Sequence, residues 1–234
     1  MNKVFLIAEI GVNWDGDFKL AENMMENAKT AGCDAVKFQS YAIETVKEHP
    51  EASRLMKSSV NDSNIEKIDD IAKTVGIEWF STPMYPEAVE LLNNYVKRFK
   101  MRWFDGKNIL ENKSSMIFDK ILDTKKDMMI SCDVNPKTSI QYNNPKISWL
   151  YCIPKYPCTI EDFDFTQIKD YDGFSNHCPH FLAPLSATIL GSKIIEVHIT
   201  SDKSKKFLDN NVSFDYSELT QLMELIRLSE KIKK

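Results

Sequence analysis

The sequence contains no long hydrophobic run, no cluster of basic residues and no CxxC pair, and each absence argues against a class of function. No apolar run approaches the roughly 20 residues that a helix needs to cross a bilayer, so no membrane partner is expected. The 30 lysines and arginines are outnumbered by 34 aspartates and glutamates and form no basic cluster, which argues against nucleic acid as a partner. The cysteines are odd in number and scattered, which fits reduced thiols in the cytoplasm better than a disulfide framework.

The N-terminal segment MNKVFLIAEIG is hydrophobic but is interrupted by Glu9, and no small-residue cleavage site follows it. We therefore expect a buried strand of the mature protein here rather than a signal peptide. With 43% hydrophobic and 27% charged residues, the whole chain has the composition of an ordinary globular protein.

Eight short apolar runs alternate with amphipathic segments along the chain. The expected strands cover residues 4–10, 35–39, 79–83, 98–103, 127–131, 147–152, 173–177 and 194–200. This alternation predicts an α/β fold with a parallel sheet, and at this length a closed (β/α)₈ TIM barrel that forms one domain over residues 1–234. A doubly wound open sheet is the alternative, because it shows the same alternation.

Several residues predict where helices begin and end. Ser63 with Glu66 has the spacing of a capping box, and Gly76 predicts the C-terminal end of the same helix. Pro86 is expected at the first position of the next helix. Residues 132–146 are rich in Asn and Pro and separate two adjacent strands, so the fifth helix of the barrel is expected to be shortened or missing.

Polar side chains lie at or near the ends of most of the predicted strands, where a buried strand would normally stay apolar. They include Glu9, Lys37, Gln39, Lys100, Arg102, Ser131, Ser175, His177 and His198. In a TIM barrel the C-terminal ends of the strands form the functional face, so we expect these side chains to converge. An edge position explains one such residue alone, but it does not explain the whole set.

The chemistry of this set points to a small anionic substrate. Cationic and hydroxyl side chains suit a phosphate or a carboxylate; they are Lys37, Lys100, Ser131 and Ser175. Glu9, and Asp202 in the segment after the last strand, are acceptors that suit sugar hydroxyls or proton transfer.

The stretch SNHCPH concentrates metal-ligating side chains in a chain that has only four histidines. His177 and His198 end neighbouring strands of the predicted barrel, and two adjacent imidazoles can hold a divalent metal. A hydrogen-bonded pair of core histidines is the alternative explanation. Cys178 and His180 are expected to be loop residues.

The chain resembles the sialic acid synthase (N-acetylneuraminate synthase) family along nearly its whole length. The segments that carry the resemblance, in order, are LIAEIGVNWDGD, DAVKFQSY, WFSTP, RFKM, ISCD, LYCIPKYPCTIEDFDF, GFSNH, LGSKIIEVHIT and DNNVSFDYSEL. The resemblance implies condensation of phosphoenolpyruvate with an N-acetylated amino sugar or a related aldose. The products would be phosphate and a nonulosonic acid, for carbohydrate biosynthesis and cell-surface glycans.

The resemblance also implies roles by position. It makes Glu9 and Asp202 sugar-side acidic residues, with Glu9 catalytic, and His177 and His198 the ligands of a divalent metal, Mn²⁺ or Mg²⁺. It assigns phosphoenolpyruvate to Lys37, Lys100, Ser131 and Ser175. Gln39 and Arg102 complete the expected substrate-binding set.

The chain also departs from the family pattern. The departures are Trp14 in place of a histidine, Arg102 and Trp103 in a segment of small residues, Asn176 in place of an aspartate, and Val197 and Asn211 in place of lysines. The family's C-terminal antifreeze-like domain is expected to be absent. Its arginine would then be replaced by Arg102, or the domain would be a separate antifreeze-like protein; a homodimer is the other expected assembly.

Two alternatives to a synthase remain open on the sequence. One is a catalytically silent synthase-like barrel that binds a sugar or a partner chain, which the departures above favour. The other is a different metal-dependent barrel enzyme, such as an aldolase or isomerase that acts on sugar phosphates.

Overall fold

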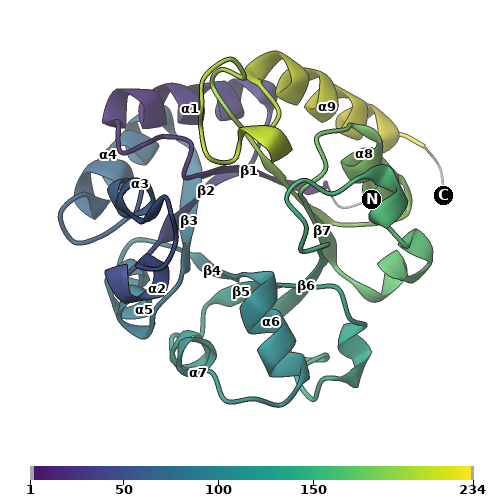
Figure 1. Cartoon of the computed structure of the whole chain (residues 1–234). Coiled ribbons are helices and arrows are strands. Elements are labelled where there is room, and N and C mark those ends of the chain that lie inside the picture. The colour runs from purple at the N-terminus through teal and green to yellow at the C-terminus, as the bar shows by residue number, and fades with distance from the viewer. Residues whose placement is uncertain (1–2, 233–234) are drawn as a thin grey trace.

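The computed structural model describes residues 3–232 and shows eight parallel strands arranged in a ring (Figure 1). The strands are β1 (Phe5–Gly11), β2 (Ala35–Ser40), β3 (Glu78–Pro83), β4 (Arg98–Met101), β5 (Asp127–Cys132), β6 (Ile147–Tyr151), β7 (Gly173–Asn176) and β8 (Ile194–His198). Their hydrogen-bonded order is β3-β2-β1-β8-β7-β6-β5-β4, so β1 and β8 are paired neighbours. The predicted TIM barrel is confirmed, with a seam between β3 and β4 where the described residues form no ladder.

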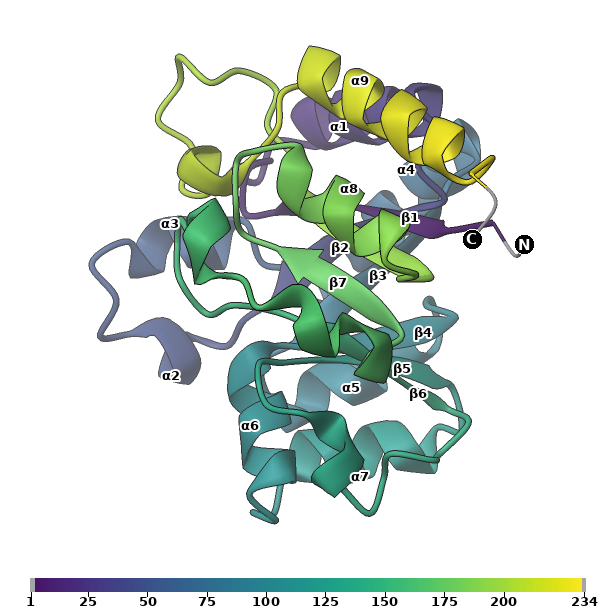
Figure 2. The ribbon, with the colours of Figure 1, turned by 90° about the vertical axis from the view of Figure 1, so that its right-hand side faces the viewer.

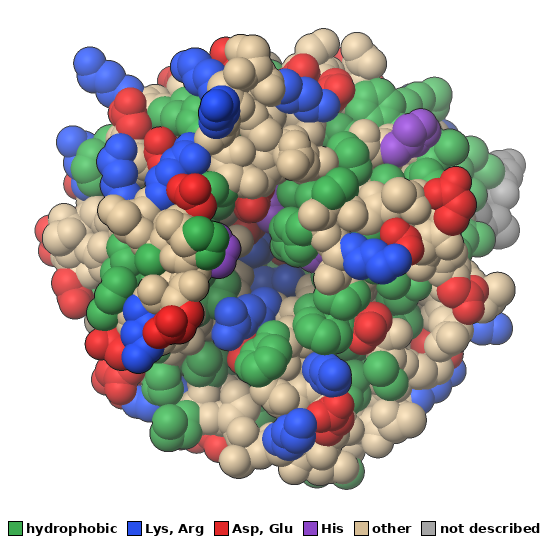
Figure 3. Space-filling model, viewed as in Figure 1, with side chains coloured by type: hydrophobic (Ala, Val, Ile, Leu, Met, Phe, Trp, Pro, Cys, Tyr) green, Lys and Arg blue, Asp and Glu red, His purple; other side chains and the backbone are tan. Residues whose placement is uncertain are grey.

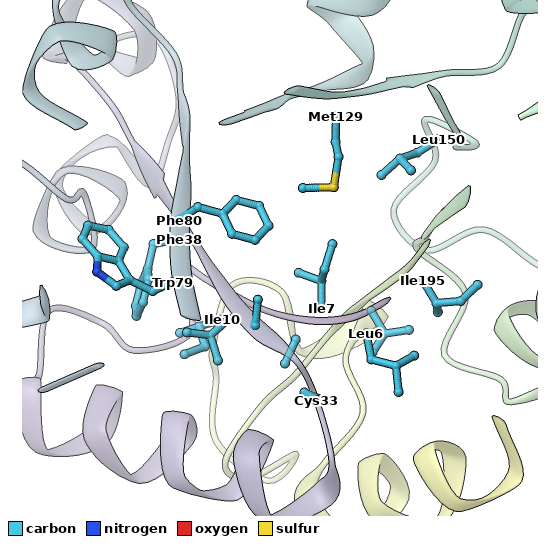
Figure 4. Close-up of a cluster of buried hydrophobic side chains, with 14 of the residues drawn as sticks. Leu6, Ile7, Ile10, Cys33, Phe38, Trp79, Phe80, Met129, Leu150 and Ile195 are labelled. Carbon is cyan, nitrogen blue, oxygen red and sulfur yellow. The ribbon is translucent and has the colours of Figure 1, made fainter. Parts of the chain in front are cut away.

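Alternation along each strand divides the side chains between the barrel interior and the helix layer. Figure 4 shows Ile7, Phe80 and Met129, from three different strands, pointing toward one another inside the ring. Successive side chains of a strand point to opposite faces. The residues two positions further along these strands, Glu9 and Ser131 among them, therefore face the same interior, nearer the C-terminal ends of the strands.

Most of the helices form an outer layer around the strands (Figure 1). The helices are α1 (Phe18–Ala31), α2 (Ile43–Val46), α3 (Ala52–Lys57), α4 (Ile65–Val75), α5 (Pro86–Asn93), α6 (Trp103–Leu110), α7 (Met116–Asp123), α8 (Leu182–Ile189) and α9 (Tyr216–Ser229). The short helices α2 and α3 and the loop before α9 lie at one end of the barrel (Figure 2). Over residues 3–232, no helix combines the length and the hydrophobicity that a membrane crossing requires.

The helix signals of the sequence are confirmed in part. Gly76 ends α4 in the left-handed conformation, and Pro86 is at the start of α5, as predicted. The capping box at Ser63 is wrong, because α4 begins one residue later, after Asn64, and the Ser63 hydroxyl donates to Asn61 Oδ1 instead. The fourth strand ends at Met101 rather than at residue 103, since Trp103 already starts α6.

The barrel wall formed by β5, β6 and β7 lacks α-helices in its two connections. The fifth connection contains only the 3₁₀ turn η1 (Pro136–Thr138), which confirms the predicted shortening, and the sixth contains only η2 (Ile160–Asp162) and η3 (Phe165–Asp170). An aromatic cluster takes the place of the sixth helix; it consists of Tyr151, Phe163, Phe165 and Phe174. Phe163 and Phe165 stack with their ring centroids 5.2 Å apart, against Phe174 of β7. Burial of these rings stabilises the wall where helical packing is absent.

Candidate active site

The C-terminal ends of the strands surround a cavity of about 350 Å³, here called the inner cavity. Figure 3 shows it as a central hollow with lysine, arginine and histidine side chains at its floor and rim. The predicted site residues that line it are Glu9, Lys37, Gln39, Lys100, Arg102, Ser131, Ser175, His177 and His198. Polar residues from almost every strand therefore converge, as the barrel geometry requires.

Two lysines and two glutamates form a buried charge network in the inner cavity: Glu9, Lys37, Lys100 and Glu196. Lys37 Nζ lies 2.9 Å from Glu9 Oε2 and 3.9 Å from Glu196 Oε1, and Lys100 Nζ lies 3.4 Å from Glu196 Oε1. All four side chains are almost completely buried. Glu196 thus links the two lysines, and its position on β8, two residues before His198, places it on the same inner face.

Serine and threonine hydroxyls complete this network. Lys100 Nζ donates to Ser131 Oγ at 2.7 Å, and Lys37 Nζ donates to Thr82 Oγ1 at 3.0 Å. Ser175 Oγ donates to Glu196 Oε1 at 2.9 Å. Cations and hydroxyls that point into one small cavity can replace the hydration shell of a phosphate or carboxylate.

The pKa values of the two glutamates are shifted in opposite directions. Burial raises the pKa of Glu9 despite its contact with Lys37. Burial also acts to raise the pKa of Glu196, but Lys100 and Lys37 outweigh it and bring that pKa down to about 2. Burial acts to lower the pKa of Lys37, but the charges of Glu196 and Glu9 raise it. When Glu9 carries its proton, the two lysines outweigh Glu196 and the network has one excess positive charge.

His177 has one fixed tautomer. Its Nδ1–H donates to the carbonyl oxygen of Ile153 at 2.8 Å, which leaves Nε2 as the acceptor for the Tyr156 hydroxyl at 2.7 Å. Burial lowers the pKa of His177 to about 4, so the ring is neutral at physiological pH. A neutral imidazole held by a backbone carbonyl is the arrangement that a metal-binding histidine usually has.

His198 lies beside His177, with the ring centroids 5.4 Å apart. Its Nδ1 is buried and 3.2 Å from Asp209 Oδ2, without a hydrogen-bond geometry to any described residue. Burial acts to raise the pKa of Asp209, but contact with His198 holds it below its usual value. Two adjacent imidazoles, one of them with an uncommitted nitrogen, are the part of the site that a divalent cation would use. Residues 3–232 contain no group of three or more histidine, cysteine or acidic side chains placed to hold a metal ion, so Asp209 does not act as a third ligand beside the two histidines in this arrangement.

Asp202 is the one predicted site residue that the structure keeps away from the inner cavity. Its carboxylate accepts hydrogen bonds from the backbone and the hydroxyl of Ser204, at the surface of the loop after β8. The acidic residue of this loop that approaches the site is Asp209, whose Oδ2 lies 3.2 Å from His198 Nδ1. Sequence reasoning missed Asp209, and it also missed Tyr156.

Of the residues that depart from the family pattern, some line the inner cavity and others lie away from it. Trp103 lines the inner cavity, and its indole N–H donates to Asp133. Trp14 is completely buried and donates to the carbonyl oxygen of Ser58, so it does not line the mouth. Val197 is buried in the hydrophobic core, and Asn211 is exposed.

An outer cavity of about 520 Å³ adjoins the inner one beneath α2 and α3. Four residues line both cavities and so mark the passage between them: Gln39, Tyr41, Arg102 and Tyr156. A hydrogen-bonded chain runs along one side of this passage, because Tyr41 donates to Gln39 and Gln39 donates to Glu9. The outer cavity also contains His49, which follows α2.

Known proteins resemble this chain in sequence and in fold. An uncharacterized protein of Methanocaldococcus jannaschii is 30% identical over 97% of this chain and 71% of its own length. Pseudaminic acid synthase of Campylobacter jejuni is 27% identical, with 97% and 74% covered. A crystal structure of N-acetylneuraminic acid (sialic acid) synthetase from Leptospira borgpetersenii superposes with a TM-score of 0.86 at 25% identity, covering 98% of this chain and 85% of that one.

The match to a protein family is equally broad, since residues 24–234 match the NeuB family. This stretch includes β2 to β8 and therefore most of the side chains of the inner cavity. The resemblance seen in the sequence is confirmed, and the chain belongs to the NeuB family of sialic acid synthase-like proteins.

Proposed function

We propose that this protein condenses phosphoenolpyruvate with an N-acetylated amino sugar or a related aldose. The products are phosphate and a nonulosonic, sialic-acid-like sugar acid. The relatives named above as pseudaminic acid and sialic acid synthases support this reaction class. The observation that carries the proposal is the buried pair Lys37 and Lys100, held beside two histidines in one cavity.

Phosphoenolpyruvate would bind in the inner part of the site. Its phosphate and carboxylate require cationic and hydroxyl donors, which Lys37, Lys100, Ser131 and Ser175 supply. Lys37 and Lys100 already lie in the network, whereas the Ser175 hydroxyl, whose one proton goes to Glu196, must turn to donate to the anion. Glu196 would hold the two lysines apart and oriented.

The acceptor would enter through the passage and place its aldehyde above the enol carbon. Gln39 and Arg102 line this passage, and Asp209 lies at its outer side. In the reaction, the electron pair of the enol double bond forms the new carbon–carbon bond to the aldehyde carbon. A water molecule adds to the phosphate-bearing carbon, and cleavage of the carbon–oxygen bond then releases phosphate and leaves a keto group. Of the two protons that the water gives up, one returns to the Glu9 carboxylate and the other leaves with the phosphate.

Glu9 is the proposed proton donor to the aldehyde oxygen. Its pKa is raised by burial, so it can hold a proton at a pH where an exposed carboxyl group would not. Gln39 Nε2 donates to Glu9 Oε1 at 2.7 Å and so connects this carboxyl group to the passage. Lys37 then stabilises the carboxylate that remains after the proton has left.

His177 and His198 would hold a divalent cation, Mn²⁺ or Mg²⁺. The carbonyl of Ile153 fixes the His177 tautomer, and the buried Nδ1 of His198 has no hydrogen-bond partner among the described residues. Such an ion, when bound, supplies Lewis-acid polarisation of the aldehyde oxygen. For the ion to reach His177 Nε2, the Tyr156 hydroxyl must move from its present position.

The test is a calorimetric titration of phosphoenolpyruvate into chelator-treated protein and into Mn²⁺-loaded protein, followed by phosphate release with a panel of amino sugars. We expect binding that Lys100→Met weakens at least tenfold, because a charged hydrogen bond contributes about 1.5–3 kcal/mol. Lys126→Met is the matched control, since Lys126 also donates hydrogen bonds, to backbone carbonyls, but lies away from both cavities.

The second candidate is a catalytically silent barrel that binds a sugar or a partner chain. The Tyr156 hydroxyl favours it, because it occupies the nitrogen of His177 that a metal would need. Wild-type protein that binds neither phosphoenolpyruvate nor Mn²⁺ at millimolar concentration would refute the synthase and leave this candidate.

A further inference from the structure

Arg102 stands directly after β4, at the passage between the inner and outer cavities. Its backbone is extended (φ −72°, ψ 167°), so it continues the strand and its side chain leaves on the same side as that of Lys100. At about 3.3 Å per residue, Arg102 lies roughly 7 Å further out than Lys100. This separation is comparable with the length of an open six-carbon chain.

Among the described residues, Arg102 is the one lysine or arginine that lines both cavities. Lys37 and Lys100 line only the inner cavity, and Lys47 lines only the outer cavity. An acceptor that extends from the inner cavity toward the outer one would therefore lie beside the guanidinium group of Arg102.

The guanidinium group of Arg102 is held in place on one side and free on the other. Its Nε donates to Asp105 Oδ2 at 2.9 Å, and its Cζ lies 5.3 Å from the ring centroid of Phe104. Asp105 itself is buried, so the anchor is rigid. The terminal nitrogens Nη1 and Nη2 donate no hydrogen bond to any described residue, and the side chain is 40% exposed. A planar donor fork with one anchored edge is suited to a phosphate or a carboxylate.

The other charged side chains of the outer cavity are mostly acidic. They are Glu44, Glu48 and Asp209, with Lys47 and the imidazole of His49. This composition disfavours an anion throughout the outer cavity. An anionic group on the acceptor is therefore best accommodated beside Arg102.

We propose that Arg102 binds an anionic group, a phosphate or a carboxylate, on the acceptor, so that the acceptor is an acidic sugar and not a neutral one. The inference rests on the proposed function, because it specifies the acceptor of that same site. Asp105 is a positioning residue in this arrangement, since it contacts Arg102 and not the acceptor.

Three probes separate the sources of the anionic group: N-acetylmannosamine, its 6-phosphate, and a hexuronate. Each is titrated calorimetrically into the full chain, with and without saturating phosphoenolpyruvate. We expect at least one of the two acidic sugars to bind at least tenfold more tightly than the neutral sugar, which corresponds to about 1.4 kcal/mol. Arg102→Gln should reduce this preference to less than twofold.

Arg54→Gln is the matched control, because Arg54 also donates from Nε to an aspartate, Asp15, at 2.9 Å but lines neither cavity. This variant should keep the preference. Lys100→Met should also keep it, because the acidic group is bound at the passage and not in the inner cavity.

Two results would overturn the inference: equal affinity for acidic and neutral sugars, or a preference that survives Arg102→Gln. A different result, the absence of phosphoenolpyruvate binding, would refute the proposed function. The sugar titrations without phosphoenolpyruvate still test Arg102 in that case.

Discussion

Replacing Glu196 by glutamine removes the one carboxylate that contacts both lysines of the buried charge network. Glutamine has nearly the same volume and still accepts a hydrogen bond from Ser175. Lys37 would keep Glu9 as a partner, but Lys100 would lose its only ion pair within residues 3–232 and keep just the Ser131 hydroxyl. The substitution therefore leaves a buried positive charge without a counter-charge.

The size of the effect follows from the pKa shift of Glu196 and from the cost of breaking a buried ion pair. A carboxyl group whose pKa falls from 4.5 to about 2 on folding has its charged form stabilised by about 3 kcal/mol. Breaking a buried ion pair by removal of one partner costs about 3–5 kcal/mol. The lower end applies here, because glutamine keeps the shape and the serine contact. For a chain of this length, about 3 kcal/mol corresponds to a fall in Tm of roughly 6–12 °C.

The assay is thermal unfolding of the wild type and Glu196→Gln followed by circular dichroism at several pH values. The folded-state pKa of Glu196 is depressed, so its stabilisation is complete above the unfolded value of 4.5 and is lost as pH falls toward about 2. The difference in Tm should be constant from pH 6 to 8 and should shrink below about pH 4.5. Glu90→Gln is the control, since Glu90 pairs with Lys120 at the exposed surface and should change Tm by only about 1–3 °C. A Glu196→Gln protein that melts within about 2 °C of the wild type at pH 7.5 would refute the reasoning.

Three further substitutions test other contacts of the site and the fold. Tyr156→Phe should raise the affinity for Mn²⁺ several-fold, measured by electron paramagnetic resonance, because it frees His177 Nε2; weaker binding would show that the phenol itself helps to hold the ion. Phe174→Ala should lower the free energy of unfolding in urea by about 3–5 kcal/mol, because it empties the centre of the aromatic cluster, and a loss below about 1 kcal/mol would contradict that role. Gly106→Ala should destabilise the protein by about 2 kcal/mol or more in the same assay, because its Cβ would lie 2.2 Å from the carbonyl oxygen of Ser131; unchanged stability would mean that α6 moves freely against β5.

The strand pattern made much of the inner cavity predictable, because side chains two residues apart on a strand share a face. Glu9, Lys37 and Lys100 were located as polar residues at the ends of predicted strands, and the two-residue period counted back from His198 would have added Glu196. Side chains at interior positions of a strand alternate between its two faces, so the face that each one points to can be predicted without knowing the fold of any loop.

Loop residues follow no such period, and the predictions there were weaker. Asp202 and Asp209 both lie in the loop after β8, and nothing in their spacing shows which of them turns toward the cavities. Tyr156 reaches His177 only because the segment after β6 folds back over the strand ends. Ser63 had the spacing of a capping residue, but a competing hydrogen bond to Asn61 decided its conformation.

The seam between β3 and β4 gives the barrel one wall whose width no backbone ladder fixes within the described residues. Thr82 and Met84 line the inner cavity at the end of β3, and Lys100 and Arg102 line it at the end of β4. These two sides can separate or approach without breaking a strand pair, whereas the opposite wall cannot. The side of the entrance that carries Lys100 and Arg102 is therefore free of the backbone pairing that, between β1 and β8, keeps Glu9 and His198 in register.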